Sequence, residues 1–213
     1  MSRVRVAVLA SGRGSNLAAL VAAARDPLYP AEIALVLSNR PGAGALERAR
    51  AAGIPAVCVD HRPFGRDRSA HEAAIHAVLE EHGIGLVALA GYMRLLTPLL
   101  VTRWQGRMLN IHPSLLPALP GLDTHGRALA AGVKLHGCTV HLVTEVMDDG
   151  PILAQAAVPV LPGDTPDTLA ARVLAQEHVV YPLALALHAG RPAHLPDPDC
   201  AMLNPLPAGH AAP

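Results

Sequence analysis

The fold is decided near the start of the chain, by the stretch V-R-V-A-V-L-A-S-G-R-G-S-N at residues 4–16. Its first part, Val4 to Ala10, is a short aliphatic run typical of a buried strand in a parallel sheet. A loop with two glycines follows, and Asn16 to Ala24 then has the spacing and residue types of a helix. The stretch therefore predicts the first strand, turn and helix of an α/β domain.

The alternation of strand and helix continues downstream. Further aliphatic runs predict strands at Ile33 to Leu37, Ala56 to Val59, Leu86 to Ala90 and Met108 to Ile111. Two segments with helical spacing predict helices at Ala43 to Ala52 and Arg68 to His82. This order calls for an α/β fold with a Rossmann-like, mostly parallel central sheet and helices on both faces.

The second half of the chain is less regular. Pro113 to Gly121 contains several prolines and is predicted to be a functional loop. Two runs of alternating character, Cys138 to Val143 and Ile152 to Val160, predict strands that extend the sheet as a hairpin pair.

A long helix is predicted at Thr165 to His188, with Asp164 as its N-cap and an interruption near Pro182. Residues 1–190 are expected to form a single domain. The tail at residues 191–213 is rich in proline and lacks periodicity, so it is expected to be extended or poorly ordered.

Composition narrows the classes of function. The 17 Lys+Arg balance the 17 Asp+Glu, so the overall charge favours neither nucleic acid nor an acidic membrane, and a small ligand is expected. The three cysteines, Cys58, Cys138 and Cys200, have neither disulfide nor zinc spacing, which indicates a reducing compartment. No signal peptide or membrane span is apparent, so a soluble, cytoplasmic protein is expected, either monomer or homodimer.

The glycine loop at residues 11–16 suits an anion. Glycine lets the backbone approach a phosphate closely, and the N–H groups at the start of the following helix attract negative charge. Gly14, Ser15 and Asn16 could hold one phosphate of a mononucleotide-like ligand. Leu17 occupies the place of the third glycine of a dinucleotide-binding motif, and no P-loop Lys is present. A plain tight turn before a helix explains the loop equally well.

A second constellation carries chemistry. In an extended strand Asn110 and His112 project from one face, and Pro113 favours such a backbone at His112. A carboxylate arriving from Asp148 could orient the imidazole and hold it protonated near neutral pH. Such a trio suits acyl or formyl transfer, in which an oxyanion develops and protons move. Taken alone, the histidine could also be an ordinary loop residue and Asp148 part of a turn.

Four motifs in this order resemble the glycinamide ribonucleotide formyltransferases, within the folate-dependent formyltransferase superfamily. They are S-G-R-G-S-N at 11–16, L-A-G-Y-M-R at 89–94, N-I-H-P-S-L-L-P at 110–117, and H-G-C-T-V-H at 136–141 leading to D-D-G-P at 148–151. The resemblance implies that 10-formyltetrahydrofolate gives its formyl group to the amine of 5′-phosphoribosylglycinamide. It implies small-molecule substrates, without nucleic acid, membrane or metal.

The resemblance also assigns residues to the two substrates. Gly14, Ser15 and Asn16 would hold the phosphate of the acceptor, with Glu177 near its ribose. The folate pocket would be lined by Met93, Arg94, Leu95 and Leu96, with Arg68 meeting the folate tail.

The catalytic roles implied by the resemblance fall on three residues. Asn110 would bind the formyl oxygen, which makes it part of the folate site as well. His112 would stabilise the oxyanion and deliver a proton to the departing folate nitrogen. Asp148 would act on His112 and help to shuttle a proton.

The chain departs from the family pattern near the acceptor. Asp123 replaces a histidine, Gly126 stands where a basic residue is common, and Leu174 stands where an amide is expected. These departures put details of acceptor binding in doubt. His125 and His136 are retained, and His136 is expected to orient the site rather than to take part in catalysis.

Three alternatives compete with this function. Formyltetrahydrofolate hydrolases use the same trio but carry an additional N-terminal domain and lack the glycine loop. Methionyl-tRNA formyltransferases need an RNA-binding domain, whereas this chain is short and not basic. A noncatalytic module that binds phosphoribosyl ligands would not need Asn110, His112 and Asp148.

Overall fold

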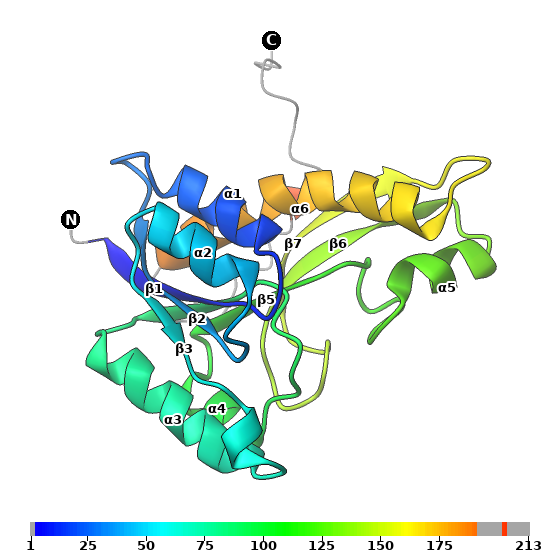
Figure 1. Ribbon diagram of the computed structural model, residues 1–213. Coiled ribbons are helices and arrows are strands. Elements are labelled where there is room, and N and C mark those ends of the chain that lie inside the picture. The colour runs from blue at the N-terminus through cyan, green and yellow to red at the C-terminus, as the bar shows by residue number, and fades with distance from the viewer. Residues whose placement is uncertain (1–2, 191–201, 204–213) are drawn as a thin grey trace.

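An eight-stranded sheet in the order β3-β2-β1-β4-β5-β6-β7-β8 forms the centre of the molecule (Figure 1). The computed structural model describes residues 3–190 and 202–203. The strands are β1 (Val4–Leu9), β2 (Ala31–Ser38), β3 (Ala56–Cys58), β4 (Leu86–Leu89), β5 (Met108–His112), β6 (Leu135–Leu142), β7 (Ile152–Pro159) and β8 (Met202–Leu203). Strands β1 to β5 are mutually parallel, whereas β6 is antiparallel to both β5 and β7. The Rossmann-like fold class and the predicted hairpin pair are confirmed.

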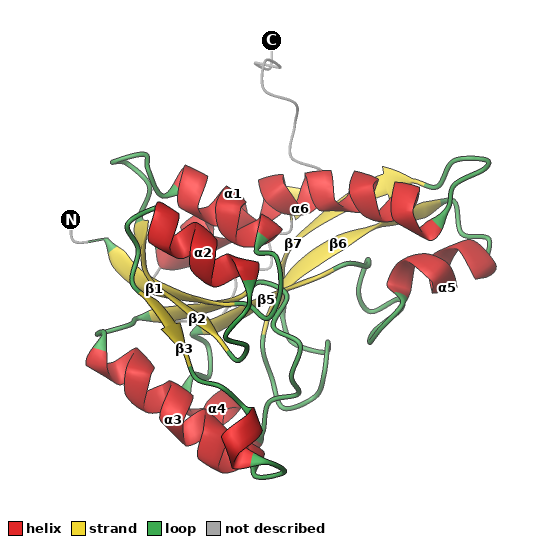
Figure 2. Cartoon of the chain, viewed as in Figure 1, coloured by secondary structure: helices red, strands yellow, loops and turns green. Residues whose placement is uncertain are grey.

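Helices cover both faces of this sheet (Figure 2). They are α1 (Ser15–Ala23), α2 (Gly44–Ala51), α3 (Arg68–Glu81), α4 (Pro98–Arg103), α5 (Thr124–Ala130) and α6 (Pro166–Ala189), with a single 3-10 turn, η1 (Arg62–Phe64). Helices α1, α2 and α6 lie on one side, and α3 and α4 lie on the other. The alternation of β1 divides its side chains accordingly, because Val6 and Val8 join the first core and Ala7 and Leu9 the second.

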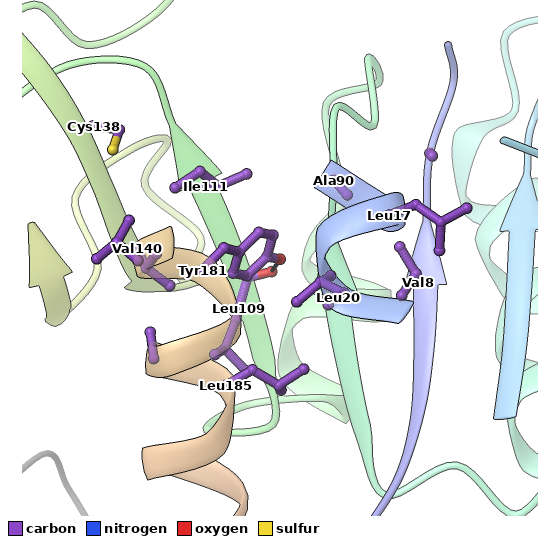
Figure 3. Packing of buried hydrophobic residues seen from close by; sticks show 14 of the residues in the cluster. Val8, Leu17, Leu20, Ala90, Leu109, Ile111, Cys138, Val140, Tyr181 and Leu185 are labelled. Carbon is purple, nitrogen blue, oxygen red and sulfur yellow. Dashed lines mark hydrogen bonds between the residues drawn. The ribbon is translucent and has the colours of Figure 1, made fainter. Parts of the chain in front are cut away.

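The core beneath α6 is built around Tyr181 (Figure 3). Its ring is fully buried with Leu109 and Leu185, and burial of each large apolar side chain contributes about 1.5–3 kcal/mol. The Tyr181 hydroxyl donates to two main-chain oxygens, of Leu89 at 3.0 Å and of Leu109 at 3.3 Å. Helix α6 is thereby attached to the carboxyl end of β4 and to the first half of β5.

Two predictions about α6 are wrong. The helix continues through Pro182 without interruption, because Tyr181 and Leu185 are packed in the core on either side of the proline. This packing outweighs the roughly 3 kcal/mol that a proline costs inside a helix. Asp164 is not the N-cap; Thr165 is, and its side chain accepts from the Thr168 main-chain N–H.

Asp164 instead forms an ion pair. Its carboxylate accepts from Arg172 at 2.7 and 2.8 Å, and from the main-chain N–H of Leu161 at 2.7 Å. Hydrogen bonding to Arg172 holds the pKa of Asp164 well below its usual range. The carboxylate thus ties the start of α6 to the chain before it.

Several short elements were not predicted, namely η1, α4, α5 and β8. The two residues of β8 pair in parallel with Ala154 and Gln155 of β7. The expectation that the rest of the tail is extended or poorly ordered concerns residues 191–201 and 204–213, which lie outside the described residues. Within residues 3–190 and 202–203, no helix has both the length and the apolar character needed to cross a membrane.

Candidate active site

The candidate site lies at the carboxyl ends of the parallel strands. β1 stands between β2 and β4, and the chain winds away from β1 in both directions. In open α/β sheets such a switch point leaves a crevice in which ligands bind. The glycine loop after β1 meets the loop after β4 here, because the Ser11 N–H donates to the Gly91 oxygen at 3.0 Å.

The antiparallel pair β5–β6 supplies the first of the candidate catalytic side chains. Asn110 pairs with His141 and His112 with Thr139, and residues directly opposite each other project on the same face. Asp148 approaches from the loop after β6, and its Oδ2 lies 3.5 Å from His112 Nδ1. The side chains of His112 and Asp148 are only 7% and 9% exposed. The three residues singled out from the sequence therefore lie together in a nearly closed space.

Local structure holds Asp148 in this position. Its backbone has a left-handed φ of 56°, which turns the chain sharply. The Gly121 N–H donates to Asp148 Oδ2 at 2.8 Å, so the carboxylate also contacts the loop that follows β5. On the other side of the ring, His112 Nε2 lies 3.1 Å from the Leu119 carbonyl oxygen. Each ring nitrogen of His112 thus faces an oxygen acceptor.

His141 is a member of this cluster to which the sequence reasoning gave no role. Its Nδ1 lies 2.9 Å from the Leu142 carbonyl oxygen, which can only accept, so Nδ1 carries the proton. Its Nε2 then accepts from Asn110 Nδ2 at 3.1 Å, and lies 3.9 Å from Asp148 Oδ1. Burial lowers the pKa of His141, so its ring is neutral near pH 7. His141 thereby orients the Asn110 amide, whose second N–H can bind an oxygen.

The loop after β5 is held by two side chains of the hairpin. Thr139 Oγ1 donates to the Ser114 oxygen at 2.7 Å and accepts from the Leu116 N–H at 3.0 Å. Gln155 Nε2 donates to the Leu116 oxygen at 2.8 Å. The irregular loop predicted at Pro113 to Gly121 is therefore irregular but fixed to the sheet.

His136 pairs with a second histidine, His125. Its Nε2 lies 3.1 Å from Nδ1 of His125 in α5, and the two rings meet edge to face. Burial lowers the pKa of His136 to about 4, and the nearby His125 and His112 add to the shift. The pair joins the start of β6 to α5, and the orienting role expected of His136 stays a prediction.

Two departures from the family pattern, Asp123 and Gly126, lie next to each other in the structure. A Cβ atom at Gly126 would lie 2.6 Å from Asp123 Oδ1, so a side chain at 126 would collide with the carboxylate in this conformation. Asp123 itself has a left-handed φ of 51° at the start of α5. The third departure, Leu174, stands on α6 three residues before Glu177, and residues three apart share a helix face.

The glycine loop has the geometry of an anion site. Gly14 is the N-cap of α1 with φ 76°, and a Cβ atom there would lie 3.0 Å from Ala45. As glycine it offers no capping side chain, so the first N–H groups of α1 are available to an anion. Asn16 Nδ2 donates to Glu177 Oε2 at 2.7 Å, and burial raises the pKa of this carboxyl. Asn16 Oδ1 is buried and has no hydrogen-bond partner among the described residues.

The stretch expected to line a folate pocket, residues 93–96, lies beside the glycine loop. Met93 and Leu95 are 63% and 60% exposed, whereas Arg94 and Leu96 are half-buried. Arg68, the first residue of α3, places Nη1 3.4 Å from the Leu95 oxygen. Exposed apolar side chains next to a guanidinium suit a ligand with an aromatic body and an acidic tail. Among the described residues no group of three or more His, Cys, Asp or Glu side chains could hold a metal ion.

Comparison with known proteins gives consistent findings. The family profile described as formyl transferase matches residues 4–185. The trifunctional purine biosynthetic protein adenosine-3 of Gallus gallus is 48% identical over 188 residues, which are 88% of this chain and 19% of that protein. The chain thus spans less than a fifth of that protein's length.

Single-activity relatives match over most of their length. The phosphoribosylglycinamide formyltransferase of Escherichia coli (strain K12) is 43% identical, and the alignment covers 87% of each chain. The crystal structure of phosphoribosylglycinamide formyltransferase from Brucella melitensis aligns with a TM-score of 0.85 and 55% identity. That alignment covers 90% of this chain and 98% of the other.

Proposed function

This chain belongs to the formyl transferase family, and from that premise we propose that it transfers the formyl group of 10-formyltetrahydrofolate to the amine of 5′-phosphoribosylglycinamide. The product would be the formylated amide, a step of purine biosynthesis. The observation that carries the proposal is the approach of Asp148 to His112 at 3.5 Å, on the strand face that also bears Asn110. The names of the relatives support the same acceptor.

The reaction needs three things from the protein: stabilisation of an oxyanion, a proton for the leaving nitrogen, and an acceptor for the proton that the amine loses. The acceptor amine attacks the formyl carbon, and an oxyanion forms where the carbonyl oxygen was. The free amide N–H of Asn110 and a protonated His112 are suited to stabilise that oxyanion. The bond to N10 of the folate then breaks, and N10 takes a proton while the new amide nitrogen loses one. His112 would supply the first proton, and Asp148 would receive the second through water.

The acceptor would bind across α1 and α6. Its phosphate would accept hydrogen bonds from the N–H groups of Gly14, Ser15 and Asn16 at the positive end of the α1 dipole. Glu177 would accept from the ribose hydroxyls, next to its bond with Asn16 at 2.7 Å. The buried, unpartnered Asn16 Oδ1 supports a ligand donor at this place.

The folate would bind along residues 93–96. Its pteridine and benzoyl rings would cover the exposed side chains of Met93 and Leu95, which removes apolar surface from water. Arg68 would pair with a carboxylate of the glutamate tail. A folate bound in this way would direct its formyl group toward Asn110 of β5, the strand beside β4.

A spectrophotometric assay tests the proposal. 10-Formyl-5,8-dideazafolate would be deformylated only when 5′-phosphoribosylglycinamide is present, and His112→Asn should lower kcat by about 10²–10⁴-fold with little change in acceptor affinity. His82→Asn is the matched control, because His82 is a half-buried histidine at the C-cap of α3, outside the proposed site. Formate release without acceptor would indicate a hydrolase instead. Tight acceptor binding without any turnover would indicate a noncatalytic module.

A further inference from the structure

Ser11 touches the loops of both proposed substrates without belonging to either binding set. It is 4% exposed and directly follows the end of the β1 run. Its main-chain N–H donates to the Gly91 oxygen at 3.0 Å, and its hydroxyl accepts from the Met93 N–H at 2.8 Å. Two bonds therefore join the first residue of the glycine loop to the start of the donor-lining stretch.

The hydroxyl proton of Ser11 is committed to a third loop. It is donated to Asn39 Oδ1 at 2.6 Å, at the carboxyl end of β2. Asn39 is 2% exposed, and its main-chain oxygen lies 2.8 Å from His61 Nδ1. The side-chain oxygen of Asn39, Oδ1, can only accept, so the Ser11 hydroxyl must donate its proton to it. The lone pairs of that hydroxyl are then left to accept from the Met93 N–H.

The donor-lining stretch is anchored differently at its far end. Thr97 donates from its N–H and from its hydroxyl to the buried Glu72 of α3, at 2.7 and 2.5 Å. Between the two anchors, Met93 and Leu95 are exposed. The stretch is thus held by Ser11 at one end and by Glu72 at the other, with Arg68 bonded to the Leu95 oxygen between them. Among the described residues, Ser11 supplies the hydrogen bond from this stretch to the glycine loop.

We propose that Ser11 is a positioning residue that couples the two substrate sites, so that acceptor phosphate on the glycine loop strengthens folate binding at residues 93–96. The inference rests on the proposed function. Ordering of the glycine loop by phosphate would fix Ser11, and Ser11 would fix the Met93 main chain through its hydroxyl. Because such coupling is a shared free energy, folate would strengthen acceptor binding by the same factor.

Calorimetric titration with 5,8-dideazafolate, the deformylated form of the donor analogue, measures the coupling without turnover. Its Kd is determined with and without saturating 5′-phosphoribosylglycinamide in the intact chain. In the unsubstituted protein the acceptor should lower this Kd by at least about 5-fold. In Ser11→Ala the ratio should fall to about one. The KM for the formyl donor should rise while kcat stays within a few-fold, since Ser11 does not touch β5.

Two variants separate coupling from loss of structure. Glu72→Gln loosens the far anchor, so it should weaken dideazafolate binding but keep the ratio. Ser38→Ala removes another fully buried hydroxyl, which accepts from the Arg40 N–H at 3.1 Å, and should leave Kd and ratio unchanged. If Ser11→Ala does not fold, Ser11→Cys keeps the side-chain volume with a weaker hydrogen-bonding group and should give an intermediate ratio.

The outcomes are distinct. A ratio near one in the unsubstituted protein, or an unchanged ratio in Ser11→Ala, overturns the coupling. Equal loss of the ratio in Ser38→Ala or Glu72→Gln overturns the assignment to Ser11. Failure of the proposed function is read separately, as absence of formyl transfer in the unsubstituted protein, because the calorimetric ratio does not depend on turnover.

Discussion

The glycine loop after β1 and the strand pair β5–β6 approach one crevice from two halves of the sheet that differ in direction. The glycine loop, in the parallel half, offers main-chain N–H groups, and its critical residue, Gly14, has no side chain. The antiparallel half offers side chains, Asn110, His112 and His141, each oriented by a neighbour. In the proposed function an anion would thus be met by backbone geometry, and a reacting carbonyl by oriented side chains. Substitutions in the antiparallel half should therefore lower kcat, whereas substitutions in the glycine loop should raise the KM for the acceptor.

The largest effect is expected from Asp148→Asn, in the antiparallel half. The amide keeps the shape of the side chain but removes the charge beside His112 and the group proposed to receive a proton. We expect kcat to fall by about 10³-fold, within the range of general acid–base contributions, and the acceptor KM to change little. Steady-state kinetics with each substrate varied in turn measures the split. An equal rise of both KM values with unchanged kcat would contradict the role.

A smaller effect is expected from low pH, which should reduce the free energy of unfolding through His136 in the antiparallel half. The pKa of His136 is about 4 in the folded chain because of burial, and it is near 6.5 when the chain is unfolded. The unfolded chain therefore takes up this proton first, and the free energy of unfolding falls as the pH drops from about 6.5 to about 4, by up to about 3 kcal/mol. Above pH 6.5 the contribution is fully present.

Urea unfolding across this pH range measures the loss. His136→Gln should reduce the slope of stability against pH, although His125 and His141, whose pKa values are also lowered by burial, contribute in the same direction. An identical slope in the variant would show that His136 does not take up a proton differently in the folded and unfolded chains.

The smallest effect is expected from Gly14→Ala, in the parallel half. The positive φ of 76° costs an alanine about 1–2 kcal/mol, and its Cβ would lie 3.0 Å from Ala45. Relief of this strain would displace the N–H groups proposed to bind phosphate. We expect the acceptor KM to rise about 10-fold while kcat at saturating acceptor stays within a few-fold. Isothermal titration with 5′-phosphoribosylglycinamide checks the change, and an unaltered Kd would remove the backbone from acceptor binding.

The parallel half could be predicted well because its strands are buried on both faces. The run at Leu86 to Ala90 is apolar throughout, and the run at Val4 to Ala10 is apolar except for Arg5, so the sequence pattern identifies both segments directly. The short helices α4 and α5, of 6 and 7 residues, are too short for a periodic pattern and were missed. The interruption predicted at Pro182 was wrong because helix propensity is a local property and does not take account of the tertiary burial of Tyr181 and Leu185.

The candidate site divides in the same way. Alternation along one strand placed Asn110 and His112 on one face, and the structure has them so. The bond that Asn110 donates to His141 depends on the register of β6 against β5, which the sequence of one strand does not contain. The three loops that meet at Ser11 are distant in sequence, so its hydroxyl carries no local signal. The roles proposed for Gly14 to Asn16, Glu177, Arg68 and residues 93–96 stay predictions.

The Tyr181 hydroxyl bonds to the main-chain oxygens of Leu89 and Leu109 and so holds β4 and β5 at a fixed separation. Just beyond it, β4 gives way to the loop that carries Gly91, and β5 continues to Asn110. The spacing between the strand that leads to the donor-lining stretch and the strand that bears Asn110 is therefore set when the chain folds. The substrates would then have to order the loops beyond these strands but not the strands themselves, so less entropy would be lost as the reacting atoms meet.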